Sequence, residues 1–213
     1  MRSSAIGRAA RPKLSFHEDS PMKNTLFAVS ALLLVSAVAG AQTVSTWTID
    51  PMHSQAGFEI RHMGVSNVRG TISKISGTVV WDEKDPSKDS VVADLDATTL
   101  DSTVAARDAH LKSPDFFNVA QYPTLHFQST SVKLINGKLQ VIGNLTLAGV
   151  TKPVTLDVDG PVPPQKGMKG GLVSGFSAST TIHRADFNFG PKFAPPMLGD
   201  DVKITLDLEI GKN

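Results

Sequence analysis

The sequence predicts an all-β domain of about eight antiparallel strands, folded as a closed barrel or a sandwich. Apolar and polar residues alternate over many short segments, which is typical of strands with one buried face and one wet face. Turn-forming residues separate these segments at short intervals. The alternating segments are residues 58–62, 75–81, 91–97, 139–147, 154–158, 176–182 and 202–210.

The final alternating segment, residues 202–210, shows the pattern clearly. Val202, Ile204 and Leu206 share one face of the expected strand, while Lys203 and Thr205 share the other. Such patterning favours antiparallel strands over parallel ones, because parallel strands are usually buried on both faces.

A tight turn and two longer loops are expected between the strands. Asn136-Gly137 lies between two alternating runs and predicts a tight hairpin turn. Residues 82–90 and 161–171 are polar or rich in Pro, Gly and Lys, and are expected to be loops.

One segment departs from the alternation. Residues 102–112 are rich in Ala and open with Ser102, a residue type that caps helices. We expect a single helix here, lying across an open end of the barrel.

The first 41 residues read as a leader rather than as part of the fold. Residues 22–41 combine Lys23, an apolar run and the small residues Ala39-Gly40-Ala41, the order found in a secretory signal peptide. The apolar run is shorter than the ~20 residues of a membrane span. We therefore expect cleavage after Ala41 and export to the periplasm, with 1–21 as an upstream extension and 42–213 as one domain.

Charge and cysteine content exclude several classes of protein. The first 41 residues hold five of the 21 basic and two of the 20 acidic residues, so residues 42–213 carry a net charge of −2. No basic stripe is present that could displace counterions from nucleic acid. The chain contains no Cys, so its stability depends on the core alone.

The residues on the inward face are compatible with two kinds of barrel interior. Eight strands give a barrel that side chains can fill or that can hold one small ligand. Several positions on this face carry small residues, which favours a cavity: Gly77, Ala93, Ala97, Gly143, Ala178 and Thr180.

A series of short sequence motifs, taken in their order along the chain, resembles the YceI-like family of periplasmic lipid-binding proteins. The more specific ones are Arg107-Asp108-x-His110-Leu111-Lys112-Ser113 and Tyr122-Pro123-x-Leu125-x-Phe127-x-Ser129. Asp50-Pro51-x-His53-Ser54 precedes them, and Gly143 to Lys152 and Arg184-x-Asp186-Phe187 follow. The resemblance extends from about Trp47 to the C-terminus.

This resemblance implies a lipocalin-like, eight-stranded antiparallel barrel with a short helix near its mouth. It implies an apolar tunnel for a polyisoprenoid or isoprenoid-quinone tail, or for a long acyl amide, and no catalytic residue. No cofactor is expected beyond such a bound lipid. The partner is then a lipid rather than nucleic acid; the sequence leaves a homodimer open.

We expect the ligand to contact large apolar residues on the inward faces, together with a few polar ones near the mouth. The candidate ligand-binding residues are Phe58, Ile60, His62, Val79, Trp81, Leu95, Arg107, Phe116, Phe117, Leu125, Phe127, Leu145, Leu156, Phe176, Ala178, Ile182, Phe187, Phe189, Ile204 and Leu206.

Other chemistries have weaker support. The histidines show no local pair at metal-ligand spacing, so we expect no metal and assign them to hydrogen bonding at strand ends. His62 is expected to make a buried structural hydrogen bond. Adjacent strand residues point to opposite faces, which argues against His53-Ser54 as a base and nucleophile.

Arg107 and Asp108 are expected to pair with different partners and to pin the helix to the barrel, with a ligand head group as the alternative for Arg107. The same structural role is expected for Arg184 and Asp186. Two other functions stay open: a lipid-modifying enzyme on this scaffold, and a filled barrel that serves as a stress-response interaction module.

Overall fold

The computed structural model describes residues 44–168 and 170–212. The expected extension (1–21) and signal peptide (22–41) lie outside these residues. Within the described part, no helix has the length and hydropathy that a membrane-crossing helix needs.

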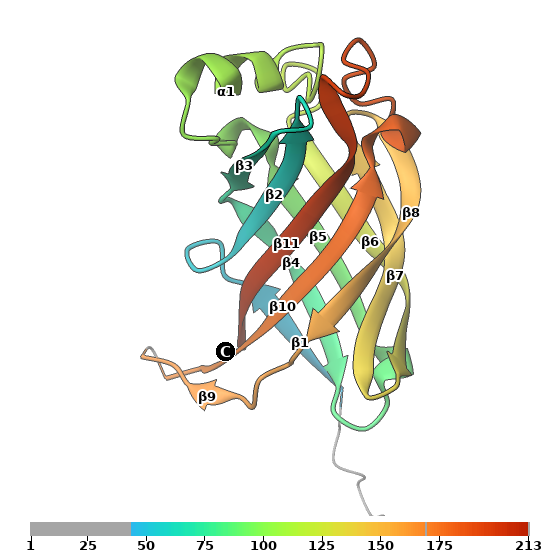
Figure 1. Ribbon diagram of the computed structural model, residues 1–213. Helices are drawn as coiled ribbons and strands as arrows, with labels where there is room; N and C mark the ends of the chain where they lie inside the picture. Colours follow the sequence, from blue (N-terminus) through green and yellow to red (C-terminus); the bar gives the residue numbers. More distant parts are fainter. Residues whose placement is uncertain (1–43, 169, 213) are drawn as a thin grey trace, which may run out of the picture. The chain divides into compact units, whose positions relative to one another are not determined.

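Eight antiparallel strands close into a barrel (Figure 1), which confirms the predicted fold class. The sheet runs β11-β1-β4-β5-β6-β7-β8-β10, and the pairing of β10 with β11 closes it. The barrel strands are β1 (Val44–Ile49), β4 (Ile75–Asp82), β5 (Ser90–Asp96), β6 (Thr124–Ile135), β7 (Lys138–Leu147), β8 (Val150–Asp159), β10 (Leu172–His183) and β11 (Leu198–Lys212).

Strand β11 has two different neighbours along its outer edge. Near its C-terminus, Gly211 and Ile210 pair with β1, whereas residues 198–207 pair with β2 (Gln55–His62). Strand β3 (Ser66–Ile72) continues the sheet beyond β2. The short β9 (Gln165–Lys166) extends the edge of β10. The hairpin of β2 and β3 therefore completes the wall at the end of the barrel near α1.

Helix α1 (Ala105–Lys112) lies over one end of the barrel (Figure 1), as the sequence predicts. Its start differs from the expectation, because the helix begins at Ala105 and Ser102 does not cap it. Thr103 has a φ of 67°, a left-handed conformation that cannot belong to the helix. Short 3-10 turns precede or follow the strands at η1 (Pro86–Lys88), η2 (Ala97–Thr99) and η3 (Arg184–Phe187).

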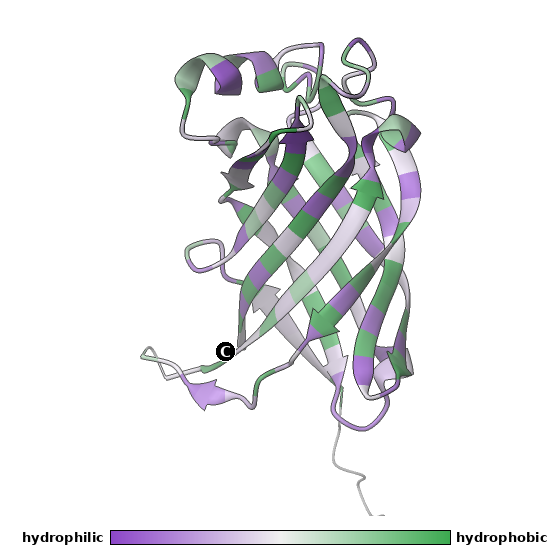
Figure 2. Cartoon of the chain, in the orientation of Figure 1, coloured by the Kyte–Doolittle hydropathy of each residue, from purple (hydrophilic) through white to green (hydrophobic). Residues whose placement is uncertain are grey.

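The predicted alternation matches the observed faces of the strands (Figure 2). Trp47, Ile49, Ile75 and Ile210 are almost fully buried where β1, β4 and β11 meet. The expected hairpin turn at Asn136-Gly137 connects β6 and β7, and both residues have positive φ.

One inward glycine does not leave space for a ligand. A Cβ atom on Gly143 would overlap the ring of Phe127 on the neighbouring strand, so the ring already occupies the space above this glycine. A small residue on the inward face can therefore serve ring packing within the wall, and the expectation that Gly143 opens the cavity is wrong.

Arg184 fixes the loop between β10 and β11. Its guanidinium is 4% exposed and lies among backbone carbonyl groups. It donates hydrogen bonds to the carbonyl oxygens of Gly199, Phe189, Gly190, Phe193 and Leu198. Because this loop borders the open end of the barrel, the arginine satisfies backbone acceptors that would otherwise lack partners.

We predict that Arg184→Lys lowers the free energy of unfolding by roughly 3 kcal/mol, since an ammonium group cannot reach five carbonyls and leaves buried acceptors unpaired. Urea denaturation followed by circular dichroism measures this change. Arg69→Lys is the control, because Arg69 is exposed and forms an ion pair with Glu59 on the outside of the barrel. Equal losses in the two variants would contradict the role given to Arg184.

Candidate functional site

A cavity of about 660 Å³ occupies the interior of the barrel. It extends from Phe193 and Met197 near α1 to Trp81 and Asp89 near η1 at the opposite end. Ligand pockets in proteins typically measure ~300–1,000 Å³, so the cavity is large enough for a ligand. The barrel is hollow, and a barrel filled by its own side chains does not describe this protein.

The wall of the cavity is almost entirely apolar. Every barrel strand except β1 contributes alternate residues to it, for example Leu139, Val141 and Leu145 from β7. This pattern follows from the period of two, since inward residues recur at every second position. A molecule held along most of this wall meets only hydrocarbon.

Helix α1 and three loops surround one end of the cavity. The helix presents Ala106, Arg107, His110 and Leu111 to the cavity. Aromatic rings pack beside it: Phe116 stacks on Phe193 with a centroid distance of 5.1 Å and an interplanar angle of 10°. Further ring contacts join Phe116 and Phe117 to Phe189.

Arg107 and Asp108 hold the helix through a shared partner. The Arg107 Nε donates to Ser102 Oγ at 2.8 Å, and the Ser102 backbone N–H donates to Asp108 Oδ1 at 2.7 Å. The expectation of different partners is therefore wrong, whereas the pinning role agrees with these contacts. Ser102 is 1% exposed, so it joins the helix to the barrel from a buried position. Hydrogen bonds from Ser102 hold the pKa of Asp108 below its usual value.

A second polar link crosses the same end of the barrel. Asp115 Oδ1 lies 2.6 Å from Lys192 Nζ, and Asp115 Oδ2 lies 3.3 Å from His110 Nε2. The hydrogen bond from Lys192 is the largest cause that lowers the pKa of Asp115. The pair connects the loop after α1 to the loop before β11, both of which border the cavity.

The opposite end of the cavity contains a carboxyl group. Asp89 lines the cavity, and its Oδ1 accepts a hydrogen bond from the Asp82 backbone N–H at 2.7 Å. Burial, together with the neighbouring Asp82 and Asp85 carboxylates, raises the pKa of Asp89 to about 6. A carboxyl group therefore lies at the end of the cavity opposite α1.

Eighteen of the twenty candidate residues line this one cavity. Ala178 does not, although its partners Val158 and Leu206 do. Phe187 does not either. It is 2% exposed and packs with Leu147 and Ile182 in a small core under η3.

His62 also differs from its expected role. It is the last residue of β2, is exposed to solvent and borders the cavity at the end near α1. A buried structural hydrogen bond is therefore wrong for this residue. His110 and His126 each lie close to one aspartate, and His53 and His183 each lie close to two carboxylates.

Several cavity residues were missing from the candidates. Val141, Val158 and Leu208 continue the inward alternation and could have been found from it. Phe193, Met197 and Asp89 come from loops or from a strand edge, where the sequence has no period to follow. Their positions depend on how the loops fold over the ends of the barrel.

A closed antiparallel barrel with an apolar interior and a short helix at one end defines the lipocalin-like class of binding proteins. Residues 47–210 match the YceI-like domain, and the chain belongs to this family. Protein YceI of Escherichia coli O157:H7 is 37% identical over 194 residues, which cover 87% of this chain and 97% of the relative.

Solved structures share the fold. The Campylobacter jejuni YceI protein superimposes with a TM-score of 0.64 at 28% identity and covers 72% of this chain and 90% of its own. A polyisoprenoid binding domain from Saccharophagus degradans gives a TM-score of 0.59 at 14% identity and covers 78% of this chain and 98% of its own.

We predict that Asp89→Asn stabilises the protein more at pH 7.5 than at pH 4.5. The folded state keeps Asp89 protonated up to about pH 6, whereas the unfolded chain ionises it near 3.8, so the stability from this group is lost as the pH rises through about 6. Asparagine resembles the protonated carboxyl and avoids this loss.

Thermal unfolding of both proteins at the two pH values measures the effect. Asp96→Asn is the control, because hydrogen bonds from Thr98 lower the pKa of Asp96 and its carboxyl is mainly ionised at both pH values in the folded and the unfolded chain; this variant should lose a similar amount of stability at both. A difference between Asp89→Asn and the unsubstituted protein that is the same at both pH values would contradict the prediction.

Proposed function

We propose that this protein binds a long apolar lipid inside the barrel and stores or transports it without chemical change. The cavity is the observation that carries this proposal, since it runs along the barrel and its wall is hydrocarbon over nearly its whole length. We further propose that the lipid is a polyisoprenoid or an isoprenoid quinone, with a long acyl amide as the alternative.

The size of the cavity supports a chain rather than a compact ligand. At ~30 Å³ for each water-sized group, 660 Å³ holds roughly 20 non-hydrogen atoms, or about four isoprene units. Strand β4 contributes Ile75, Val79 and Trp81, so the wall follows the strand over several residues at ~3.3 Å each. An extended chain fits this shape.

Hydrophobic burial supplies the binding energy in this proposal. Each methylene moved from water to the cavity contributes ~0.8 kcal/mol, so a chain needs no strong polar contact. The family relationship agrees with this proposal, as does the polyisoprenoid-binding description of the Saccharophagus neighbour.

We also propose that the protein acts outside the cytoplasm, after removal of residues 1–41. The signal-like segment 22–41 supports this proposal.

Organic extraction of the purified protein, followed by mass spectrometry, tests the function directly. The protein should be produced with its leader in a bacterium that makes isoprenoid quinones. We expect a long-chain isoprenoid in near-stoichiometric amount. The absence of both a co-purified lipid and uptake of an added isoprenoid quinone would contradict the proposal. Recovery of a chemically altered lipid would favour an enzyme instead.

We predict that Thr180→Phe weakens binding of an isoprenoid quinone about 100-fold. Thr180 lines the cavity on β10, and a phenyl group there displaces three or four carbon groups of the ligand at ~0.8 kcal/mol each. Quenching of tryptophan fluorescence measures binding, since Trp81 lines the cavity.

Thr181→Phe is the matched control, because Thr181 is the next residue on the same strand and faces solvent. It should leave the affinity unchanged. Equal affinities of the two variants would argue against binding inside the barrel.

A further inference from the structure

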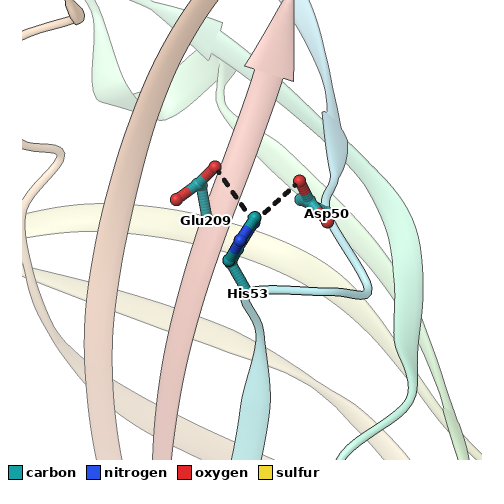
Figure 3. A group of neighbouring side chains, drawn as sticks. All are labelled: Asp50, His53 and Glu209. Carbon is teal, nitrogen blue, oxygen red and sulfur yellow. Dashed lines mark hydrogen bonds and ion pairs between the residues drawn. The ribbon is translucent and has the colours of Figure 1, made fainter. Parts of the chain in front are cut away.

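We propose that Asp50, His53 and Glu209 form a binding site for a divalent first-row transition metal such as Zn²⁺, on the outside of the barrel and separate from the lipid cavity. The three side chains converge where the turn after β1 meets β11 (Figure 3). None of the three lines the cavity.

The ligand atoms already have the spacing that a zinc ion needs. His53 Nδ1 lies 3.1 Å from Asp50 Oδ2 and 3.5 Å from Glu209 Oε1, and the three ligand atoms all lie within 4.8 Å of one another. Ligands at ~2.0–2.2 Å in a tetrahedral zinc site are about 3.4 Å apart. A metal ion can therefore bind between these three atoms with little movement of the side chains.

The backbone around the cluster is fixed by hydrogen bonds. The Asp50 N–H donates to the Glu209 carbonyl at 2.8 Å, and the Glu209 N–H donates to Ser54 Oγ at 3.1 Å. Ser54 is 4% exposed, so these contacts hold the turn against β11 from inside the protein. Both carboxylates consequently start from anchored positions, which reduces the entropy lost when a metal binds.

The carboxylate of Asp50 is also aimed at the site. The Met52 N–H donates to Asp50 Oδ1 at 2.7 Å, which leaves Oδ2 directed at His53.

The donor set selects the class of metal. One imidazole nitrogen and two carboxylate oxygens suit Zn²⁺ and its first-row neighbours, whereas Mg²⁺ and Ca²⁺ prefer oxygen ligands alone. The His53 side chain is 62% exposed, so solvent can reach the remaining coordination position.

A second cluster on the same strand lacks these features and provides a comparison. His183 Nδ1 lies 2.8 Å from Asp201 Oδ1 and 3.7 Å from Asp200 Oδ2. The Asp201 side chain is 72% exposed, and the register of β11 is irregular between Leu198 and Val202. This cluster is therefore less fixed than that of Asp50, His53 and Glu209.

Isothermal titration calorimetry of the EDTA-treated protein with ZnCl₂ tests the site. We expect one site for each chain, with at least 10-fold weaker binding in His53→Gln and Glu209→Gln and unchanged binding in His183→Gln. MgCl₂ should produce no comparable heat. Because His53 is exposed, His53→Gln should fold normally, which circular dichroism checks.

Two further measurements locate the ion. Crystals soaked in ZnCl₂ should show an anomalous peak between Asp50, His53 and Glu209, and saturating Zn²⁺ should raise the melting temperature by about 5 °C in the unsubstituted protein but not in His53→Gln. No binding up to millimolar Zn²⁺, equal affinity in His53→Gln, or loss of binding only in His183→Gln would overturn the proposal. None of these outcomes bears on lipid binding.

Discussion

The continuous pairing of β10 with β11 is the interaction on which the rest of the structure depends. Twelve residue pairs, from Leu172 with Lys212 to His183 with Asp201, close the sheet on itself. Closure removes the free edges that an open sheet would expose and separates an inside from an outside. Without it the apolar face of each strand would need another layer to cover it.

The other edge of β11 shows how this barrel accommodates a long strand. The strand pairs with β1 near its C-terminus and with β2 over residues 198–207. Two short strands therefore pair along this edge of β11, where one long strand could have done so. The turn between β1 and β2 is held at this transition by Ser54 and Asp50. The same arrangement brings His53 and Glu209 together, although they are far apart in the sequence.

Sequence patterning predicted the parts of the fold that repeat. The faces of β7, β10 and β11 follow directly from alternation, because a strand must place every second side chain on the buried side. The turn at Asn136-Gly137 and the presence of α1 were also predictable from local residue preferences. Local preference was less accurate at the start of α1, where Ser102 is used for tertiary contacts with Arg107 and Asp108 rather than for capping.

The interior could be predicted only in part. The alternation identifies which side chains face inward, but the space between them depends on how rings pack across strands. Gly143 illustrates this, since the Phe127 ring occupies the space that the glycine leaves. Arg184 was recognised as structural, yet its carbonyl partners come from a loop without any sequence period. Loop geometry at the ends of the barrel is set by such tertiary contacts.

The polar groups of the cavity are distributed unequally between its two ends. Arg107 and His110 lie at the end near α1, whereas the Asp89 carboxyl lies at the other end. In a low-dielectric tube the field of such groups is poorly screened, so the two directions of insertion differ in energy. A chain with one hydrogen-bond-accepting terminus is expected to enter tail first and to keep that terminus beside α1. For the lipid proposed above, the barrel would therefore set the direction of insertion.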